Sequence, residues 1–376
     1  MTQPKNYGFE EEAAMLKDSA RRFFTEKLPV DQLHALVASD FAPDRPPVVS
    51  WREDLWQQMV ELGWTSLAVP ERAGGLGLPW VAVAGLLEES GRAAFPSPLL
   101  ATLQVTALLA ASDSGADDAL GEIAEGKAAS IACMNASGAL DASAVQAIDG
   151  KLNGTACYVQ DAGKCDRLLV LASEEVGTGL YWVDPDIQGV AVHQDAIVDL
   201  TRDQGHVEFT AVSAQRIADA DAVLSAALPV IWTLISADMI GAAEWQLQTT
   251  VEYAKQREQF DRQLGFFQAV KHDLVNVMIS IDESKSLLYN AACALDCEPA
   301  RAAQCAHMLK ASASDMAALA SGRSVQCHGG IGFTWECFVH LYFKRQKHSQ
   351  LLWGDAAWHR AALADLVIGL TGARAA

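Results

Sequence analysis

Two stretches of the chain carry residue types suited to ligand contact. The first is QCHGGIGFTWE, residues 326–336, which places three glycines within four positions directly after a predicted helix. Glycine ends helices in the left-handed conformation, so the cluster alone indicates a helix C-cap and a turn. It does not match the GxGxxG phosphate fingerprint, which also requires a preceding strand. The second stretch is YAKQREQFDRQLGFFQAVKHDL, residues 253–274, where one predicted helix ends and another begins.

The cysteines show no spacing that would indicate a structural zinc site. They contain no CxxC pair and stand at Cys133, Cys157, Cys165, Cys293, Cys297, Cys305, Cys327 and Cys337. Cys293 and Cys297 lie four residues apart on a predicted helix face and, with His307, offer an alternative set of metal ligands. Small core residues are the favoured interpretation, so we expect reduced thiols and no metal.

Helical patterns occupy both ends of the chain, and strand patterns occupy the middle. Short β-prone runs separated by glycine or acidic turns begin at about Ala129 and end at Ser213. Long helical patterns then cover residues 222–256, 266–296, 300–326 and 350–369. We therefore predict an α+β fold with an N-terminal helical domain (1–128), a small antiparallel β-barrel or sandwich (129–213) and a C-terminal four-helix bundle (214–376).

Composition excludes several classes of function. The 376 residues are 51% hydrophobic, enough for two or three domains with real cores. The net charge of −19 opposes binding to nucleic acid or to an anionic membrane. The first residues show no secretory signal, and the most apolar stretch, 222–237, is shorter than the about 20 residues of a bilayer span and contains Pro229. We expect a cytoplasmic protein without nucleic-acid or membrane partners.

The two ligand-contact stretches together resemble a known family. The pattern YxxxRxxFxxxLxxFQAVKHxL, followed later by QxxGGIGFTxE, is similar to the C-terminal domain of the acyl-CoA dehydrogenase family. The segments LWQQMVELGWTSLAVPERAGGLGLP and KLNGTACYVQDAGKCDRLLVLA resemble the early helix and loop of that family and its β-domain. The likeness runs over nearly the whole chain in the right order, and it implies the fold of that family and FAD as cofactor.

The resemblance also implies which residues contact FAD. In the family, an arginine at the position of Arg257 reaches the FAD pyrophosphate of a neighbouring subunit, a task that suits a permanently charged planar group. Gln326 and the bare backbone that follows it would approach the adenosine and pyrophosphate part of a second subunit's FAD. The cofactor-binding residues implied by the matched motifs are Arg257, Phe260, Gln268, Gln326, Gly329 and Gly330.

The β-domain segment departs from the family pattern. The family's TExxxGSD-like segment corresponds here to CMNASGALDAS, which has no glutamate. The tryptophan expected on the flavin ring corresponds to Tyr158, and the threonine near the flavin N5 edge corresponds to Gln160. Tyr158 can still offer an aromatic face to the flavin, with an ordinary strand aromatic as the alternative.

A catalytic carboxylate is missing where the resemblance would place one. The family removes an α-proton from an acyl-CoA thioester, a very weak acid, so a carboxylate must be held against it. The two positions that supply this base in the family correspond to Trp353 and Ile231, and neither side chain accepts a proton. Asp355 is the nearest carboxylate, but two residues along a helix turn it about 200° away, and a charge at a helix N-terminus is the favoured role. The catalytic base is therefore unassigned.

This combination resembles one branch of the family. In bacterial α2β2 acyl-CoA dehydrogenases that shorten steroid side chains, one subunit carries the glutamate and its homologue contributes FAD contacts. The segments WGDAAWHR and FTWE look like that branch. The resemblance implies FAD-dependent oxidation of a bulky acyl-CoA, such as a steroid side-chain acyl-CoA, to the trans-2-enoyl-CoA. It also implies a base-bearing homologous subunit as partner and an electron-transferring flavoprotein as acceptor.

Two alternatives stay open. One is a homotetrameric acyl-CoA dehydrogenase that uses Asp355 or another carboxylate as an atypical base. The other is a non-catalytic scaffold that keeps the fold and has lost the flavin, because fold alone does not establish function. Both enzyme interpretations require a dimer or tetramer, since the cofactor residues need a second chain to supply the rest of the site.

Overall fold

The computed structural model describes residues 3–37, 51–112 and 114–369. They form two compact units, each assembled from separate stretches of the chain. Among the described residues, the helical unit draws on 3–37, 79–95 and 229–369, and the sheet unit draws on 51–78, 96–112 and 114–228. The three predicted domains follow the sequence order instead, and their two boundaries stay a prediction.

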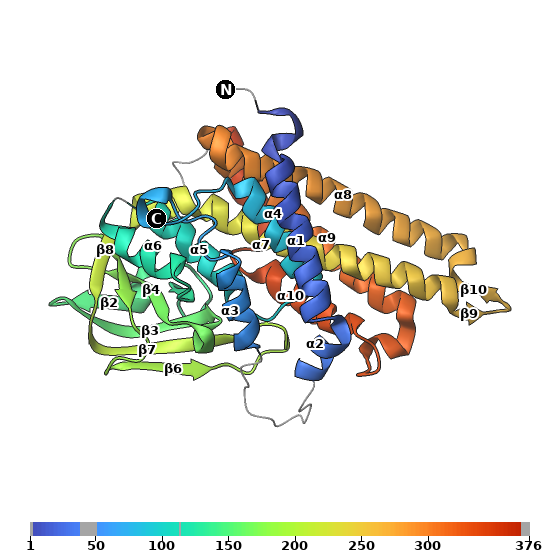
Figure 1. The fold of residues 1–376 in the computed structure, drawn as a ribbon, viewed down its shortest axis with the longest axis horizontal. Helices are drawn as coiled ribbons and strands as arrows, with labels where there is room; N and C mark the ends of the chain where they lie inside the picture. The colour runs from blue at the N-terminus through green and yellow to red at the C-terminus, as the bar shows by residue number, and fades with distance from the viewer. Residues whose placement is uncertain (1–2, 38–50, 113, 370–376) are drawn as a thin grey trace. The chain divides into compact units, whose positions relative to one another are not determined.

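Long helices build the helical unit. They are α1 (Glu11–Lys27), α2 (Val30–Val37), α4 (Trp80–Arg92), most of α7 (Ala220–Gln256), α8 (Gln268–Cys297), α9 (Pro299–His328), α10 (Val339–Leu351) and α11 (Ala356–Ile368). A hairpin of β9 (Glu258–Gln259) and β10 (Arg262–Gln263) connects α7 to α8, and short 3-10 turns cover Lys5–Gly8, Leu264–Phe266 and Gly329–Phe333. The helix α9 packs against α8, α10 and α11, whereas α1 packs against α4 (Figure 1).

Two glycines allow α4 and α7 to cross at close range. A Cβ atom at Gly91 would lie 2.0 Å from the carbonyl oxygen of Asp238, and one at Gly241 would lie 1.8 Å from the carbonyl oxygen of Glu88. Both distances are far below van der Waals contact, so only residues without a side chain fit at this crossing. The helix α7 is long and apolar enough to pass a length and composition test for a membrane span, but 78% of its most apolar window is buried in the protein.

A network of charges joins four helices of the helical unit, α1, α4, α7 and α8. The Lys17 ammonium and the Tyr289 hydroxyl both donate to Glu88 Oε2 at 2.6 Å. The Lys285 ammonium lies 3.0 Å from Glu88 Oε1 and 2.5 Å from Glu244 Oε1. Burial acts to raise the pKa of Glu88, but the ammonium groups of Lys17 and Lys285 lower that pKa below its ordinary value. Removing one member would leave an uncompensated buried charge at a cost of about 3–5 kcal/mol.

The sheet unit combines three helices with one sheet. The helices are α3 (Glu53–Glu61), α5 (Leu99–Ala110) and α6 (Asp117–Ala124), with short 3-10 turns at Glu71–Ala73, Ser114–Ala116, Ala142–Ala144 and Ala162–Lys164. The strands are β1 (Ala129–Ala132), β2 (Val145–Ile148), β3 (Lys151–Gln160), β4 (Arg167–Ser173), β5 (Thr178–Val183), β6 (Val190–Gln194), β7 (Gln204–Ser213) and β8 (Gln215–Asp219). Their order is β6-β7-β3-β2-β4-β5-β8, and β1 pairs with β4.

The predicted order of helices, strands and helices is confirmed, with two additions. The sheet is mainly antiparallel, but β1 runs parallel to β4, and the strand β8 lies beyond Ser213, where the strand pattern was expected to end. The helix α10 was not predicted separately, and the expected helix at 350–369 begins only at Ala356. The buried face of α10 mixes apolar residues with polar ones such as Arg345 and Gln346, which hides its periodicity in the sequence.

The structure does not support the alternative cysteine metal site. All eight cysteines are free thiols within the described ranges. Burial raises the pKa of Cys293 to about 12, which disfavours the thiolate form of the free side chain. His307 is committed elsewhere, because its Nδ1 lies 2.8 Å from His359 Nδ1.

Candidate active site

Arg257 follows directly after α7, where the chain enters the β9–β10 hairpin. Its N–H donates to the Tyr253 carbonyl at 2.8 Å, and its own carbonyl accepts from the Leu264 N–H at 2.8 Å, so the backbone is fixed on both sides. The residue is exposed, and the guanidinium forms no hydrogen bond or ion pair with any described residue. Because its backbone is fixed and its guanidinium has no partner among the described residues, Arg257 can bind a phosphate or another chain.

Phe260 stands at the tip of this hairpin in an unfavourable position. Phe260 and Asp261 form the two-residue loop with φ of 55° and 57°, the left-handed conformation that such loops require. Asparagine and glycine suit that conformation, whereas a bulky aromatic residue does not. The Phe260 side chain is also 86% exposed, with only an edge contact to Phe267 at 6.3 Å between ring centroids. Neither burial nor backbone preference accounts for phenylalanine here.

The glycine cluster follows the last residue of α9. Gly329 ends the helix with φ of 66°, and a Cβ atom at Gly329 or at Gly330 would meet nothing within 4 Å. The positive φ explains glycine at position 329, but neither backbone conformation nor internal packing requires it at position 330. Gly322, Gln326 and Gly329 follow the i, i+4, i+7 spacing of one helix face, so this end of α9 presents largely bare backbone to the outside.

Ring and charge contacts hold the ends of α7, α8 and α9 together. The Tyr253 ring stacks on the His328 ring with centroids 4.2 Å apart, which ties the end of α7 to the residue before Gly329. Arg323 lies 3.3 Å from Asp273, which ties α9 to the first turns of α8. This end of the helical unit therefore carries all six motif residues predicted from the C-terminal pattern, and every one of them is exposed: Arg257, Phe260, Gln268, Gln326, Gly329 and Gly330.

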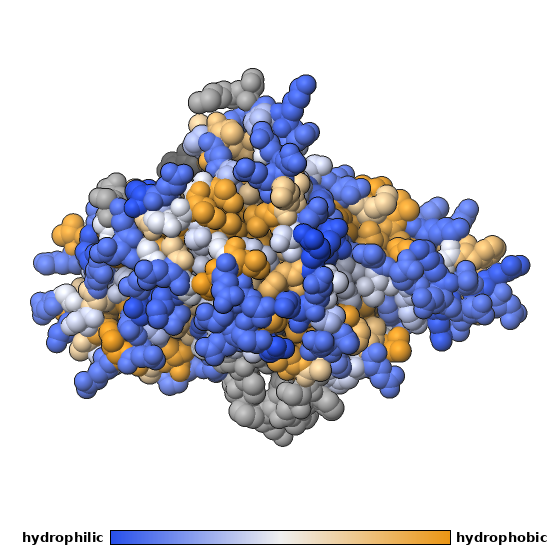
Figure 2. Space-filling view, viewed as in Figure 1, coloured by the Kyte–Doolittle hydropathy of each residue, from blue (hydrophilic) through white to orange (hydrophobic). Residues whose placement is uncertain are grey.

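An exposed apolar stripe runs along α8 from the same end. Val275, Met278 and Ile279 are 46%, 44% and 47% exposed and lie on one helix face. Figure 2 shows hydrophobic atoms gathered along α8 between hydrophilic ones. Contiguous apolar surface of this kind marks an interaction site rather than a solvated helix face.

Tyr158 belongs to the sheet unit. It lies in β3, where the pairing with β7 shifts between Ala156 and Val159, and its φ is 56°. The side chain is 39% exposed, and its hydroxyl donates to the Ala136 carbonyl at 3.0 Å. Ala136 belongs to the CMNASGALDAS segment, so the two sheet-unit segments that resemble flavin-lining parts of the family lie in contact.

Three predicted site residues share the left-handed backbone conformation. The φ angles of Tyr158, Phe260 and Trp353 are 56°, 55° and 60°. This conformation costs an ordinary residue about 1–2 kcal/mol, and such strain concentrates at functional sites. The amino-acid sequence gives no sign of it, because bulky aromatic residues are poor candidates for left-handed positions.

The two positions of the expected base are closed to proton chemistry. Ile231 is fully buried on α7, and Trp353 lies in the connection between α10 and α11. Asp355 is the N-cap of α11, where its Oδ1 accepts from the Trp358 N–H at 2.8 Å. The carboxylate of Asp355 is thus engaged in helix capping.

A histidine pair lies beside Trp353, and sequence reasoning missed it as a unit. His359 Nε2 lies 3.1 Å from the Trp353 carbonyl, which only accepts, so Nε2 carries the proton and Nδ1 is the acceptor. His307 must then donate its Nδ1 proton to His359 Nδ1 across 2.8 Å. Burial lowers the pKa of both rings, that of His359 to about 3, so the pair is neutral. The two residues are 52 positions apart, and no local pattern links them.

Lys310 fixes the segment that carries Trp353. Its ammonium donates to the carbonyls of Gln350 and Gly354 at 3.1 and 2.8 Å, and to the Ser314 hydroxyl at 3.1 Å. Burial lowers the pKa of Lys310 to about 7. Three acceptors match the three N–H groups of an ammonium ion, so the group is held in place from all sides.

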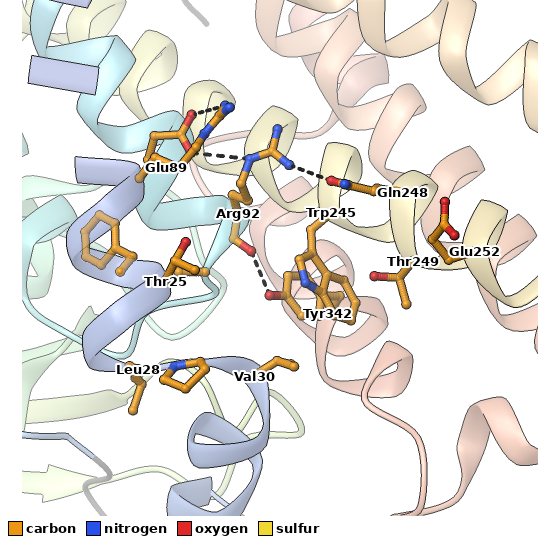
Figure 3. A pocket seen from close by; sticks show the side chains of 14 residues that line it. Thr25, Leu28, Val30, Glu89, Arg92, Trp245, Gln248, Thr249, Glu252 and Tyr342 are labelled. Atoms are coloured by element: carbon orange, nitrogen blue, oxygen red, sulfur yellow. Dashed lines mark hydrogen bonds and ion pairs between the residues drawn. The ribbon is translucent and has the colours of Figure 1, made fainter. Parts of the chain in front are cut away.

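A cavity of about 660 Å³ lies between α1, α4, α7 and α10 of the helical unit (Figure 3). The Trp245 and Tyr342 rings stack along it with centroids 3.8 Å apart, and the Tyr342 hydroxyl donates to the Arg92 carbonyl at 2.7 Å. The Arg92 guanidinium lies 3.3 Å from Glu89 and 3.5 Å from Gln248. Glu89 and Glu244 compensate Arg92, and Glu89 also pairs with Arg21, so both arginines among the lining residues have acidic partners.

Two family models match the chain. The acyl-CoA dehydrogenase N-terminal domain matches residues 10–127, and the acyl-CoA dehydrogenase C-terminal domain matches residues 222–368. The acyl-CoA dehydrogenase IpdE2 of Mycobacterium tuberculosis is 32% identical over 344 residues, which are 91% of this chain and 93% of that protein. The chain belongs to the acyl-CoA dehydrogenase family.

Solved structures agree with the family assignment. The Tcur3481-Tcur3483 steroid ACAD variant superposes with a TM-score of 0.85 at 30% identity, covering 96% of this chain and 99% of that one. The ChsE4-ChsE5 complex from Mycobacterium tuberculosis superposes with a TM-score of 0.84 at 24% identity, covering 96% and 98%, and that similarity shows the fold alone. The predicted acyl-CoA dehydrogenase fold is confirmed.

The predicted site residues can be placed relative to the two acyl-CoA dehydrogenase domains that match the chain. Residues 257–330, with all the motif residues of the helical unit, fall inside the C-terminal domain match, as does Trp353. Tyr158 falls between the two matched ranges. The role of each residue in this acyl-CoA dehydrogenase stays a prediction.

Proposed function

We propose that this chain is the FAD-contacting subunit of a heteromeric acyl-CoA dehydrogenase whose catalytic base comes from a homologous subunit. One observation carries the proposal. At one end of the helical unit, Arg257 and Gly330 face outward with nothing in the described chain that uses them, whereas the base positions hold Ile231 and Trp353. The features for cofactor contact are kept, and the group for proton removal is lost.

The exposed residues fit the chemistry of FAD. A pyrophosphate needs a permanent positive charge in a fixed place, which Arg257 offers, and it needs close approach of backbone, which Gly330 permits. The strained and exposed Phe260 adds an apolar surface at the same end. When bound, FAD supplies the acceptor for the β-hydride of the acyl-CoA.

This chain's own residues exclude it from the proton step. The α-proton of the thioester must pass to a carboxylate, and the chain offers an apolar Ile231 and an indole at the two family positions. Asp355 holds the first turn of α11, and the His307–His359 pair is neutral and bonded to the Trp353 carbonyl. The base must therefore come from the partner, which gives the trans-2-enoyl-CoA as product.

The similarity to a steroid ACAD structure supports a bulky acyl-CoA of the steroid side-chain class as substrate. The Tcur3481-Tcur3483 structure, at 30% identity, carries the names of two proteins, which supports a heteromer. The apolar stripe on α8 offers a surface for such a partner. We expect an electron-transferring flavoprotein to receive the electrons.

The test is expression of this chain alone and together with a base-bearing homologue. The proposal predicts flavin absorbance and ferrocenium-coupled oxidation of a bulky acyl-CoA only after co-expression. Flavin and activity in the chain alone would instead support a homotetramer, and a chain that stays colourless in both cases would support a scaffold without flavin.

A matched pair of arginine variants tests the cofactor contact. In the co-expressed enzyme, Arg257→Ala should weaken FAD binding by about 10–100-fold, because a hydrogen bond to a charged group contributes about 1.5–3 kcal/mol. The control is Arg262→Ala, five residues along the same hairpin, whose guanidinium lies over the Phe266 ring at 5.0 Å. Equal flavin content in both variants would remove Arg257 from the site.

A further inference from the structure

The outer edge of the sheet unit brings two histidines and a carboxylate to one face. The strand β6 is an edge strand of the sheet and pairs antiparallel with β7 (Figure 1). In this register His193 lies opposite His206, and Ala191 lies opposite Glu208. Residues 206 and 208 are two apart on β7, so their side chains share the face on which His193 stands. All three side chains are accessible to solvent in whole or in part.

The close approach of the strands at this point depends on a glycine. A Cβ atom at Gly205 would lie 2.4 Å from the His193 carbonyl oxygen, so only glycine allows β7 to reach β6 in this register. The two imidazole rings then stack with centroids 4.8 Å apart and planes inclined by 15°. One ligand atom from each of His193, His206 and Glu208 lies within 4.8 Å of the others.

Asp195 prepares one of these rings for a metal ion. Its Oδ1 lies 2.9 Å from His206 Nδ1, and a carboxylate only accepts, so His206 carries its proton on Nδ1 and exposes a lone pair on Nε2. Asp195 is itself held by its N–H, which donates to the Gln204 carbonyl at 2.9 Å, and by the Gln204 amide at 3.4 Å. A carboxylate that fixes the tautomer of a ligand histidine is the usual outer partner in metal sites.

We propose that His193, His206 and Glu208 form a binding site for a late first-row divalent cation, with Zn²⁺ as the preferred occupant. Two imidazoles and one carboxylate are a ligand set that zinc uses, with water in the fourth position. Zinc bonds to nitrogen at about 2.0–2.1 Å, which puts two nitrogens on one tetrahedral ion about 3.3 Å apart. The exposed rings need to close by about 1.5 Å at most, which rotation of surface side chains supplies.

The site would join the edge strand to its neighbour. Bound zinc would link β6 to β7 across the register that Gly205 permits. This role is independent of the cofactor and base residues of the helical unit. Zinc binding should therefore raise the temperature at which the sheet unit unfolds and leave flavin content unchanged.

Zinc calorimetry on the full chain, after chelator treatment and dialysis, tests the proposal. We expect one zinc ion to bind per chain, with binding lost in His206→Gln and in His193→Gln. Asp195→Ala should bind zinc about 10–100-fold more weakly, as substitutions of the group that orients a ligand do. The control is His272→Gln, an exposed histidine at the start of α8, which should bind zinc like the original chain.

A cobalt spectrum separates this site from the thiols of the chain. With Co²⁺, nitrogen and oxygen ligands give weak visible bands, whereas thiolates add strong near-ultraviolet charge-transfer absorption. We expect visible bands without the thiolate absorption, and we expect them to disappear in His206→Gln. Absence of zinc binding, equal binding in His206→Gln, or a thiolate spectrum would each overturn the proposal. Circular dichroism without metal checks that the variants fold, which their exposed positions favour.

Discussion

The hairpin end of the helical unit and the surroundings of Trp353 use polar and aromatic residues in opposite ways. At the hairpin end, Arg257 is unpaired among the described residues, Phe260 is exposed and Gly330 borders open space. Around Trp353, the His359 ring, the Lys310 ammonium and the Asp355 carboxylate all bond within the chain. The residues named at the hairpin end are therefore available for contacts with another molecule, whereas those named around Trp353 have their partners within the chain.

The difference supports the proposal that cofactor contact and proton removal occur at separate places in this fold. The predicted contact residues lie where α7 and α9 end and α8 begins, and the predicted base positions lie on the body of α7 and in the α10–α11 connection. Substitutions at one place leave the other intact because no side chain is shared between them. A duplicated subunit can therefore lose its base and still serve a cofactor held by a partner.

The largest effect on FAD binding should come from placing a bulky side chain in the glycine cluster of the hairpin end. Gly330→Leu has room within its own chain, since a Cβ there meets nothing within 4 Å, so the chain should fold. Against a bound FAD the added side chain should cost about 1–3 kcal/mol, which weakens FAD binding by up to about 100-fold. Flavin titration of the co-expressed enzyme measures this.

The matched control for that substitution is Ala357→Leu, which adds leucine to an exposed position of α11. It should leave FAD binding unchanged. If Gly330→Leu also leaves FAD binding unchanged, the bare backbone of the hairpin end does not face the cofactor, and the contrast between the two regions fails.

A second substitution separates the backbone strain at Phe260 from the role of its side chain in FAD binding or subunit association. Phe260→Asn places a residue that tolerates φ of 55° at the hairpin tip, so the free energy of unfolding should stay equal or rise. FAD binding or subunit association should weaken by about tenfold, because truncating a buried interface aromatic commonly costs more than 1 kcal/mol. Urea unfolding and flavin titration test both parts, and a variant with both properties unchanged would leave the strain at Phe260 unexplained.

Around Trp353, the contribution of the side chains to the free energy of unfolding should depend on pH rather than on flavin binding. Burial lowers the pKa of His359 to about 3, whereas an unfolded histidine titrates near 6.5. Between these values the unfolded chain binds a proton that the folded chain does not, so stability is present above about pH 6.5 and is lost as pH falls toward 3. From pH 7 to pH 5 this histidine alone should remove about 2 kcal/mol of unfolding free energy.

Urea unfolding of the original chain and of His359→Gln at both pH values measures that contribution. The variant should lose about 2 kcal/mol less than the original chain over this range, because glutamine does not titrate. Identical losses would show that the ring is not held neutral, and the internal completeness of this region would then be in question.

The sequence predicts more about the hairpin end of the helical unit than about the surroundings of Trp353. The hairpin-end residues come from two continuous motifs, so the resemblance of these motifs to a known family groups Arg257 with Gly330 and implies the fold around them. The surroundings of Trp353 are formed by residues that are distant in the sequence. Lys310 contacts Gly354, and His307 contacts His359, which is 52 positions away. These contacts depend on how α9 packs against its neighbouring helices, including α11. The helix α10 was missed for a related reason, since its buried polar residues remove the periodic signal.

The smallest effect tests whether Asp355 belongs to structure or to catalysis. Its carboxylate caps α11, so Asp355→Ala should lower the free energy of unfolding by about 1 kcal/mol. Asparagine caps a helix almost as well as aspartate but cannot accept a proton as a base, so Asp355→Asn should keep both stability and turnover in the co-expressed enzyme. Loss of turnover in a stable Asp355→Asn enzyme would identify this carboxylate as the base. It would also place proton removal back in this subunit, because a cap and a base make different demands on the same oxygen atoms.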